Sequence, residues 1–413
     1  AIIGFAGFAA IVSVDASLNL LAKDIFSVFA SYNLTVIPLF VLMGQVSFHS
    51  GISRRLFQAA YNWFGPLPGG LAMATVGACG AFGAICGSSM ATAATMAQVA
   101  LPELKRAGYD NGLSAGALAA GGTLGILIPP SVVLVLYGMI ARQPVGQLWL
   151  AGVLPGLLMA TVFVLYIMVR CRLNPALAPT VKDEDLNMPM IEKLRLLRAG
   201  IVPFLIFFFM TGLFVLGYTS LVESSAVGAT AATLAAAIKG RLTWPMIKET
   251  SRKTLAISSM FLWLILAALA FGAVFDGLGA ARALENLFIG QLHLEPWRVL
   301  TMMMSHFIIL GIFLDDTAML VIVAPLYIPL VRILGYDLVW FGVLYTITCQ
   351  IAYITPPFGY NLFLMRAMAP KEITLVDIYR SIWPFVIMMV GCILLVAVFP
   401  GLALWLPNTL YAK

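Results

Sequence analysis

Long apolar stretches, separated by short polar connectors, run through the whole chain. A transmembrane helix needs about 20 consecutive apolar residues. The spans that approach this length are Leu34–Phe48, Trp149–Val169, Ala199–Leu216, Leu221–Ile238, Ala256–Phe275 and Trp383–Leu404. Basic, partly amphipathic connectors lie between them at Gly51–Phe64, Leu186–Arg198, Thr243–Thr254 and Thr374–Arg380. We expect these connectors to lie along the membrane surface, and the whole pattern predicts an all-α, polytopic membrane protein.

Two more apolar segments are each interrupted by a pair of prolines. Gly122–Gly138 contains Pro129 and Pro130, and Gln350–Phe363 contains Pro356 and Pro357. A proline pair removes two backbone donors and disfavours helix at the residue before it. We therefore expect two half-helices around an unwound link in each segment. Such a link is tolerated at membrane depth only where it lines a cavity or a buried site, although one pair alone is also compatible with a simple kink.

Two further apolar regions carry polar residues near their middle. Gly70–Leu101 contains Ser88 and Ser89, and Val299–Leu330 contains Asp315 and Asp316. Each half of these regions has about 15 residues, which is short for a full crossing. We interpret both regions as re-entrant helical hairpins with polar tips.

An internal duplication relates these features. The proline pairs are separated by 227 positions (356 − 129), and the same offset takes Ser88 to Asp315 and LPELKRAGYD (101–110) to IPLVRILGYD (328–337). Five predicted crossings separate the two copies, and an odd number predicts an inverted repeat. The charge distribution agrees: with Arg54, Lys105, Arg170 and residues 182–198, 239–253 and 366–380 in the cytoplasm, about 18 of the 24 Lys and Arg lie inside.

Composition narrows the class further. Of 413 residues 62% are hydrophobic, 10% are charged, and the mean hydropathy is +0.99, far from the balance of soluble domains. The net charge of +6 arises from short basic runs between spans, so we predict no nucleic-acid partner. Scattered cysteines and isolated histidines suggest neither disulfides nor a zinc site. The chain has no Gly-x-Ser-x-Gly or His-Glu-x-x-His motif, so we predict that it is not an enzyme.

The hairpins and breaks supply chemistry suited to ions. Half-helix N-termini offer partial positive charge to an anion, and unwound carbonyls offer oxygen ligands to a small cation. In the first copy CGSSM (86–90) faces the broken segment, and carbonyl and hydroxyl oxygens there suit sodium. In the second copy LDDTAM (314–319) faces residues 354–361, where Asp315 or Asp316 adds negative charge. Either aspartate is alternatively a cap of the hairpin's second arm, and the two roles are compatible.

The motifs GSSMATAATM, GTLGILIPPS, ESSAVGA, FLDDTAMLVIVAPLYIP and QIAYITPPFGYNLF resemble the large membrane subunit of TRAP transporters, the DctM family. The resemblance implies sodium-coupled uptake of an organic anion, such as a C4-dicarboxylate or sialic acid, by an elevator mechanism across the bacterial inner membrane. It implies two partners, a small DctQ-type membrane subunit and a periplasmic DctP-type binding protein, and no cofactor besides the coupling ion Na+. The alternative is a stand-alone sodium/anion symporter of the same superfamily.

The resemblance also implies positions for the sites. The first sodium site uses backbone oxygens at Cys86, Ser88, Gly125, Ile128 and Pro130. The second sodium site involves Asp315, Asp316, Ala352, Thr355 and Pro357. The expected substrate-binding residues are Ser88, Ser89, Ser131, Thr317 and Asn361. Cys86 stands where the family often has Ser, which is harmless if only its carbonyl binds, and Ala352 stands where Gly is common.

The predicted organisation is a fixed scaffold around a moving transport domain. Residues 1–66 form scaffold helices and an interfacial arm, and residues 148–295 form further scaffold helices and arms. Residues 67–147 and 296–370 form the two halves of the transport domain, each with a hairpin and a broken helix. Residues 371–413 form an interfacial helix and a transmembrane helix. The chain begins inside an apolar run, residues 1–14, and we expect part of a first helix to lie upstream.

Overall fold

The computed structural model describes residues 32–179, 205–206, 208–277, 279–369 and 373–411, together with Phe26 and Ala30. All regular elements in these ranges are helical, which confirms the predicted all-α class. The connector Leu186–Arg198 and much of the span Ala199–Leu216 lie outside the described residues. The described end of that span contains the π-helix η4 (Phe208–Gly212) and α12 (Leu213–Val215).

Five of the six predicted full-length spans correspond to described helices. They are α3 (Val36–His49), α9 (Val145–Leu173), α13 (Leu221–Ile238), α14 (Trp244–Gly277) and α20 (Leu375–Val398). By length and composition five helices in the described part of the chain are able to cross a membrane, namely α9, α13, α20 and the two arms of the second hairpin. The bent pair formed by α3 and the helix after it makes a sixth. The chain is therefore a multi-pass membrane protein.

Two predicted surface connectors are helical and continuous with the spans that follow them. Thr243–Thr254 leads directly into α14, and Thr374–Arg380 begins α20. A capping box explains why α20 begins at the connector. The Thr374 hydroxyl accepts the Asp377 N–H, and the Asp377 carboxylate accepts the Thr374 N–H. Such a pair of bonds stabilises a helix start. Helix α20 then ends at Val398, before Pro400, and α21 (Gly401–Tyr411) follows. The connector Gly51–Phe64 is the separate helix α4 (Ile52–Phe64).

Both predicted hairpins are present. The first consists of α5 (Gly70–Cys86) and α6 (Ser89–Arg106), and the second of α16 (Pro296–Phe313) and α17 (Asp316–Ile333). Gly87 makes the first turn possible because its φ of 62° lies in the left-handed region that favours glycine. Each arm of the second hairpin has 18 residues, more than the sequence suggested and long enough to cross a membrane. That these hairpins are re-entrant stays a prediction.

Both proline pairs break a helix as predicted. Helix α7 (Asn111–Thr123) tightens into the 3₁₀ turn η2 (Leu124–Ile126), and the chain becomes helical again only at α8 (Val132–Ala141). In the second segment α18 (Leu338–Tyr353) ends before the prolines and α19 (Tyr360–Met368) follows them. Both Pro-Pro peptide bonds are cis.

The offset of 227 positions also relates the observed helices. Adding 227 to the bounds of α6 (89 and 106) gives 316 and 333, which are the bounds of α17. The caps correspond as well: Ser88 accepts from the N–H of Ala91 at 3.4 Å, and Asp315 accepts from that of Ala318 at 2.9 Å. Side chains at equivalent positions therefore start equivalent helices.

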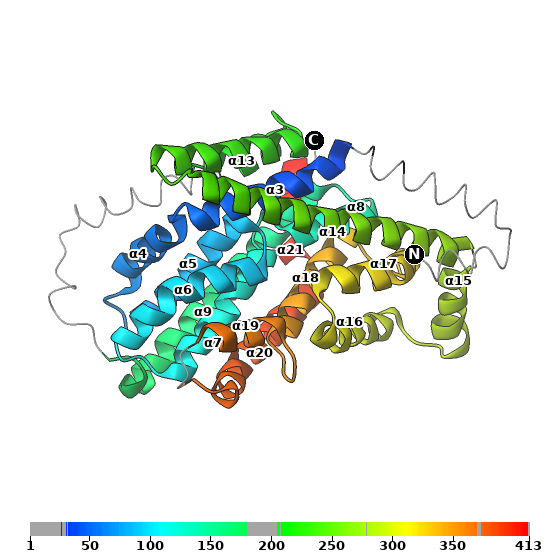
Figure 1. Ribbon diagram of the computed structural model, residues 1–413. Helices are drawn as coiled ribbons and strands as arrows, with labels where there is room; N and C mark the ends of the chain where they lie inside the picture. The colour runs from blue at the N-terminus through cyan, green and yellow to red at the C-terminus, as the bar shows by residue number, and fades with distance from the viewer. Residues whose placement is uncertain are drawn as a thin grey trace.

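Helices α3, α13 and α14 lie together but also contact the hairpins, because α14 packs against α17 and α3 against α5 (Figure 1). Helix α3 lies against α13 and α14 along one side of the molecule, at the top of the view. Helix α9 instead packs against α5, α8, α18, α20 and α21, and α20 packs against α7. The long helices α9 and α20 are thus in contact with the hairpin and broken-helix elements, although the sequence-based division places them in other segments.

Candidate functional site: two broken helices and two hairpin tips

The tip of the first hairpin is pressed against the first break, and glycines permit the contact. A Cβ atom at Gly125 would lie 2.6 Å from the Thr92 hydroxyl and 2.9 Å from the Ser88 carbonyl oxygen. A Cβ atom at Gly87 would lie 2.6 Å from the Pro130 carbonyl oxygen. No real Cβ fits at such distances, so only glycine allows this approach. The predicted ligands Ser88, Gly125 and Pro130 therefore lie at this junction. The same contacts do not involve the carbonyls of Cys86 and Ile128, the other two predicted ligands.

The proline pair leaves one carbonyl of this group without its helical donors. The carbonyl of Gly125 would normally accept from residue 128 or 129, but the Ile128 N–H donates to the Leu124 carbonyl and Pro129 has no N–H. The carbonyl of Ile126 also lacks helical donors, because the residues three and four positions later are Pro129 and Pro130, which have no N–H. There the Ser131 hydroxyl takes their place at 2.5 Å. An unpaired buried carbonyl is costly, so the Gly125 oxygen is suited to bind a cation.

Side chains around the tip fix its geometry. The Thr92 hydroxyl donates to the Ser88 carbonyl at 2.7 Å and lies 2.9 Å from the Cys86 sulfur. The Ser88 hydroxyl caps α6. Ser131 caps α8 by accepting the Leu134 N–H at 3.2 Å, besides donating to Ile126. Ser88 and Ser131, which the sequence suggested as substrate ligands, thus have structural hydrogen bonds in this conformation.

At the second hairpin the aspartates have distinct positions. Asp315 is the N-cap of α17, which confirms the capping role proposed as an alternative. Asp316 is buried, with its Oδ1 accepting the Thr317 hydroxyl at 3.2 Å, and its backbone carbonyl accepts the Tyr345 hydroxyl at 2.5 Å. The hairpin also lies close to the second break, because a Cβ atom at Gly311 would lie 2.6 Å from that of Ala352.

The second break holds its carbonyls differently from the first. The Ala352 carbonyl accepts the Thr355 N–H at 3.2 Å, and the Pro357 carbonyl accepts the Tyr379 hydroxyl at 2.5 Å. The Thr355 hydroxyl donates to the Ile351 carbonyl at 2.6 Å. The carbonyl without donors is that of Tyr353, because the residues three and four positions later are Pro356 and Pro357. We did not predict Tyr353, although the spacing to the prolines contains this signal.

A buried polar cluster connects the two copies. The Asn361 amide, in the first turn of α19, donates to the Ser89 hydroxyl at 2.9 Å and to the Ala119 carbonyl at 3.3 Å. The Gln350 amide donates at 2.7 Å to the carbonyl of Thr123, which lies one turn after Ala119 in α7. The side-chain oxygens of Asn361 and Gln350 are buried and have no hydrogen-bond partner in the described structure. The predicted residues Ser89 and Asn361 therefore meet, whereas the contacts of Thr317 remain within its own hairpin tip.

Fold and site together define a polytopic helical membrane protein with two paired hairpins and broken helices. Residues 1–402 match the family described as "Tripartite ATP-independent periplasmic transporter, DctM component". The chain is 31% identical to the C4-dicarboxylate TRAP transporter large permease protein DctM of Pseudomonas aeruginosa, over 95% of this chain and 90% of that protein. It is 28% identical to the sialic acid TRAP transporter permease protein SiaT of Haemophilus influenzae, over 92% of this chain and 60% of that protein.

The chain therefore belongs to the DctM family of TRAP transporter large permeases, and it is a transporter component rather than an enzyme. Among solved structures it resembles the Alcanivorax borkumensis YdaH transporter with a TM-score of 0.65. That similarity covers 94% of this chain and 89% of YdaH at 17% sequence identity, so it concerns the fold alone.

Proposed function

We propose that this chain is the large permease subunit of a sodium-coupled importer of an organic anion in a bacterial inner membrane. The observation that carries the proposal is the first hairpin tip docked on a proline break. There Gly125, whose carbonyl has no helical donor, lies against the Ser88 carbonyl, and Gly87 lies against the Pro130 carbonyl. Backbone oxygens in such an arrangement bind a small, hard cation without requiring a carboxylate.

The second ion is held at the second break in this proposal. Asp316 supplies a buried negative charge beside the tip, and the carbonyl of Tyr353 supplies an oxygen without helical donors. Asp315, Thr355 and the carbonyls of Ala352 and Pro357 complete the candidate set. Most of these groups already make one hydrogen bond, but each carbonyl or carboxylate oxygen has a second lone pair.

The substrate lies between the two tips in our proposal. Ser89 and Asn361, which are hydrogen-bonded to each other at 2.9 Å, belong to the first turns of α6 and α19, and helix N-termini favour anions. The relatives named for C4-dicarboxylate and sialic acid transport support a carboxylate as the cargo. The assembly works with a small membrane subunit and a periplasmic binding protein, as family membership implies.

Movement follows an elevator scheme in this account, with the two copies related as an inverted repeat. The coincidence of helix bounds and caps at an offset of 227 supports the repeat. We assign α9 and α20 to the moving unit with the hairpins, because they pack on its helices. We assign α3, α13 and α14 to the scaffold, since α13 and α14 both pack on α3, and the contact of α14 with α17 then lies between scaffold and moving unit.

Uptake by proteoliposomes tests the proposal. The chain is reconstituted with its small subunit, and the loaded binding protein is added outside. An inward sodium gradient is expected to drive accumulation, whereas a potassium gradient is not. Omission of the binding protein distinguishes a tripartite importer from a stand-alone symporter, which would transport without it.

A further inference from the structure

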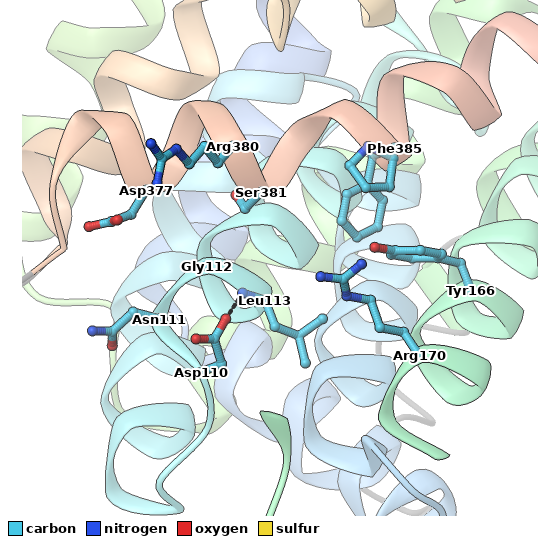
Figure 2. Close-up of a pocket in the computed structure, with 11 residues that line it drawn as sticks. Asp110, Asn111, Gly112, Leu113, Tyr166, Arg170, Asp377, Arg380, Ser381 and Phe385 are labelled. Carbon is cyan, nitrogen blue, oxygen red and sulfur yellow. Dashed lines mark hydrogen bonds between the residues drawn. The ribbon is translucent and has the colours of Figure 1, made fainter. Parts of the chain in front are cut away.

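A polar cavity lies away from both breaks, where α9 ends and where α7 and α20 begin. Its volume is about 360 Å³. It is lined by the first residues of α7 (Asp110 to Leu113), by Tyr166 and Arg170 of α9, and by α20 from Asp377 to Phe385. Figure 2 shows the Arg170 side chain extending from α9 toward Leu113, with the Tyr166 ring beside it. Nothing in the transport scheme uses this cavity.

The cavity contains two arginines, Arg170 of α9 and Arg380 of α20. Neither Arg170 nor Arg380 forms an ion pair with any residue that the structure describes. The Arg170 guanidinium lies 5.9 Å from the centre of the Tyr166 ring, a cation–π contact that orients it. A planar guanidinium, with five donors in a fixed fork, is well suited to bind a phosphate.

The two aspartates of the cavity are partly engaged as helix caps. Asp110 accepts the Leu113 N–H through Oδ1 at 2.8 Å, and Asp377 accepts from Thr374 through Oδ2 at 3.0 Å. The other oxygen of each carboxylate makes none of these bonds and is available to an ammonium donor. The lining therefore offers binding groups for both charges of a zwitterion.

The surroundings of the cavity are apolar and exposed. Leu165 and Val169 of α9 are 47% and 52% exposed, and Trp383 and Ile387 of α20 are 51% and 67% exposed. Val169 is three residues from Tyr166, and Trp383 is three residues from Arg380, so each lies on the helix row beside the cavity. In a membrane protein such surfaces contact lipid chains. Both arginines are also in segments that the charge pattern assigns to the cytoplasmic side.

We propose that this cavity binds the headgroup of one phosphatidylethanolamine molecule from the cytoplasmic leaflet. The phosphate binds Arg170 and Arg380, the ammonium group binds the free oxygens of Asp110 and Asp377, and the acyl chains lie along the exposed rows of α9 and α20. A zwitterionic headgroup fits better than that of phosphatidylglycerol, which carries the same phosphate charge but no cation to pair with the two carboxylates.

Lipid binding by the purified full-length chain tests this site. Delipidated protein in detergent is titrated with phosphatidylethanolamine, and bound lipid is counted by native mass spectrometry. We expect one molecule bound to the wild type and binding at least about tenfold weaker in Arg170→Gln, because a charge-assisted hydrogen bond is lost. Arg172→Gln is the matched control: Arg172 is exposed at the same helix end but does not line the cavity. Its binding is expected to equal that of the wild type.

Additional measurements distinguish an effect on headgroup binding from an effect on folding. Thermal unfolding without added lipid is expected to be the same for both Arg variants, and Arg380→Gln provides a second test from the opposite wall. Phosphatidylglycerol and phosphatidylcholine are expected to bind more weakly than phosphatidylethanolamine. Equal lipid binding by Arg170→Gln and Arg172→Gln, tighter binding of phosphatidylglycerol, or displacement of the lipid by inorganic phosphate contradicts the proposal. None of these results depends on sodium coupling.

Discussion

Replacing Gly125 by alanine perturbs the proposed first sodium site at its most crowded point. The added methyl group would lie 2.6 Å from the Thr92 hydroxyl, 2.9 Å from the Ser88 carbonyl oxygen and 3.3 Å from the Cα of Gly83. Two of these neighbours are backbone atoms, and the Thr92 hydroxyl is itself hydrogen-bonded to Ser88. Relief therefore requires that the hairpin tip moves away from the break.

The size of the effect follows from the cost of overpacking. Adding a methyl group to a closely packed interior typically costs about 1–3 kcal/mol. If the added methyl group destabilises the ion-bound state by that amount relative to the ion-free state, apparent sodium affinity falls by about 5- to 150-fold. The affinity for the loaded binding protein should not change, because the perturbed contact is buried within the membrane subunit.

The assay is a sodium titration of uptake by proteoliposomes, with thermal unfolding measured on the same preparations. Gly391→Ala is the matched control: Gly391 is also in a helix, but an added Cβ there meets nothing within 4 Å. We expect its titration to match the wild type. A Gly125→Ala protein that is folded and has the sodium dependence of Gly391→Ala would falsify the assignment of this junction as an ion site.

Three further substitutions test the rest of the site. Asp315→Asn keeps a capping side chain but removes the charge, so we expect weaker sodium activation at unchanged thermal stability. If the sodium titration is unchanged, the role of Asp315 is restricted to capping. Loss of the cap in Asp315→Ala costs about 0.5–2 kcal/mol of stability. Gln350→Leu removes the hydrogen bond from the Gln350 amide to the Thr123 carbonyl, which should lower the unfolding free energy by about 0.5–1.5 kcal/mol, and unaltered thermal unfolding argues against that hydrogen bond. Asn361→Leu should reduce uptake at least about tenfold through lost polar contacts, and wild-type uptake by a folded variant removes Asn361 from the substrate site.

The sequence predicted the breaks and hairpins because proline and cap chemistry act locally. Pro129 and Pro130 remove two helical donors wherever they stand, and Ser88 or Asp315 starts a helix by accepting a backbone N–H a few residues along. Helix lengths were less predictable. The turns before residue 256 and before residue 383 were expected to be surface connectors, yet they continue the same helices as the spans. Polarity alone does not end a helix.

Contacts between the copies required the structure. The bond from Asn361 to Ser89 joins residues 272 positions apart, and no local pattern predicts such a pair. The carbonyl of Tyr353 follows from local spacing alone, because Pro356 and Pro357 remove both of its helical donors. At the first break the Ser131 hydroxyl compensates for the same loss. The equivalent position in the second copy, 131 + 227 = 358, is Phe358, which has no hydroxyl. The two breaks therefore differ chemically.

The central claim is that transport is coupled to sodium through the large subunit described here. The most direct test compares uptake into proteoliposomes that contain both membrane subunits, with the loaded binding protein outside, under equal inward gradients of sodium or potassium. We predict substrate accumulation with sodium alone, and its collapse when an ionophore dissipates the sodium gradient. Equal accumulation with potassium would contradict the account.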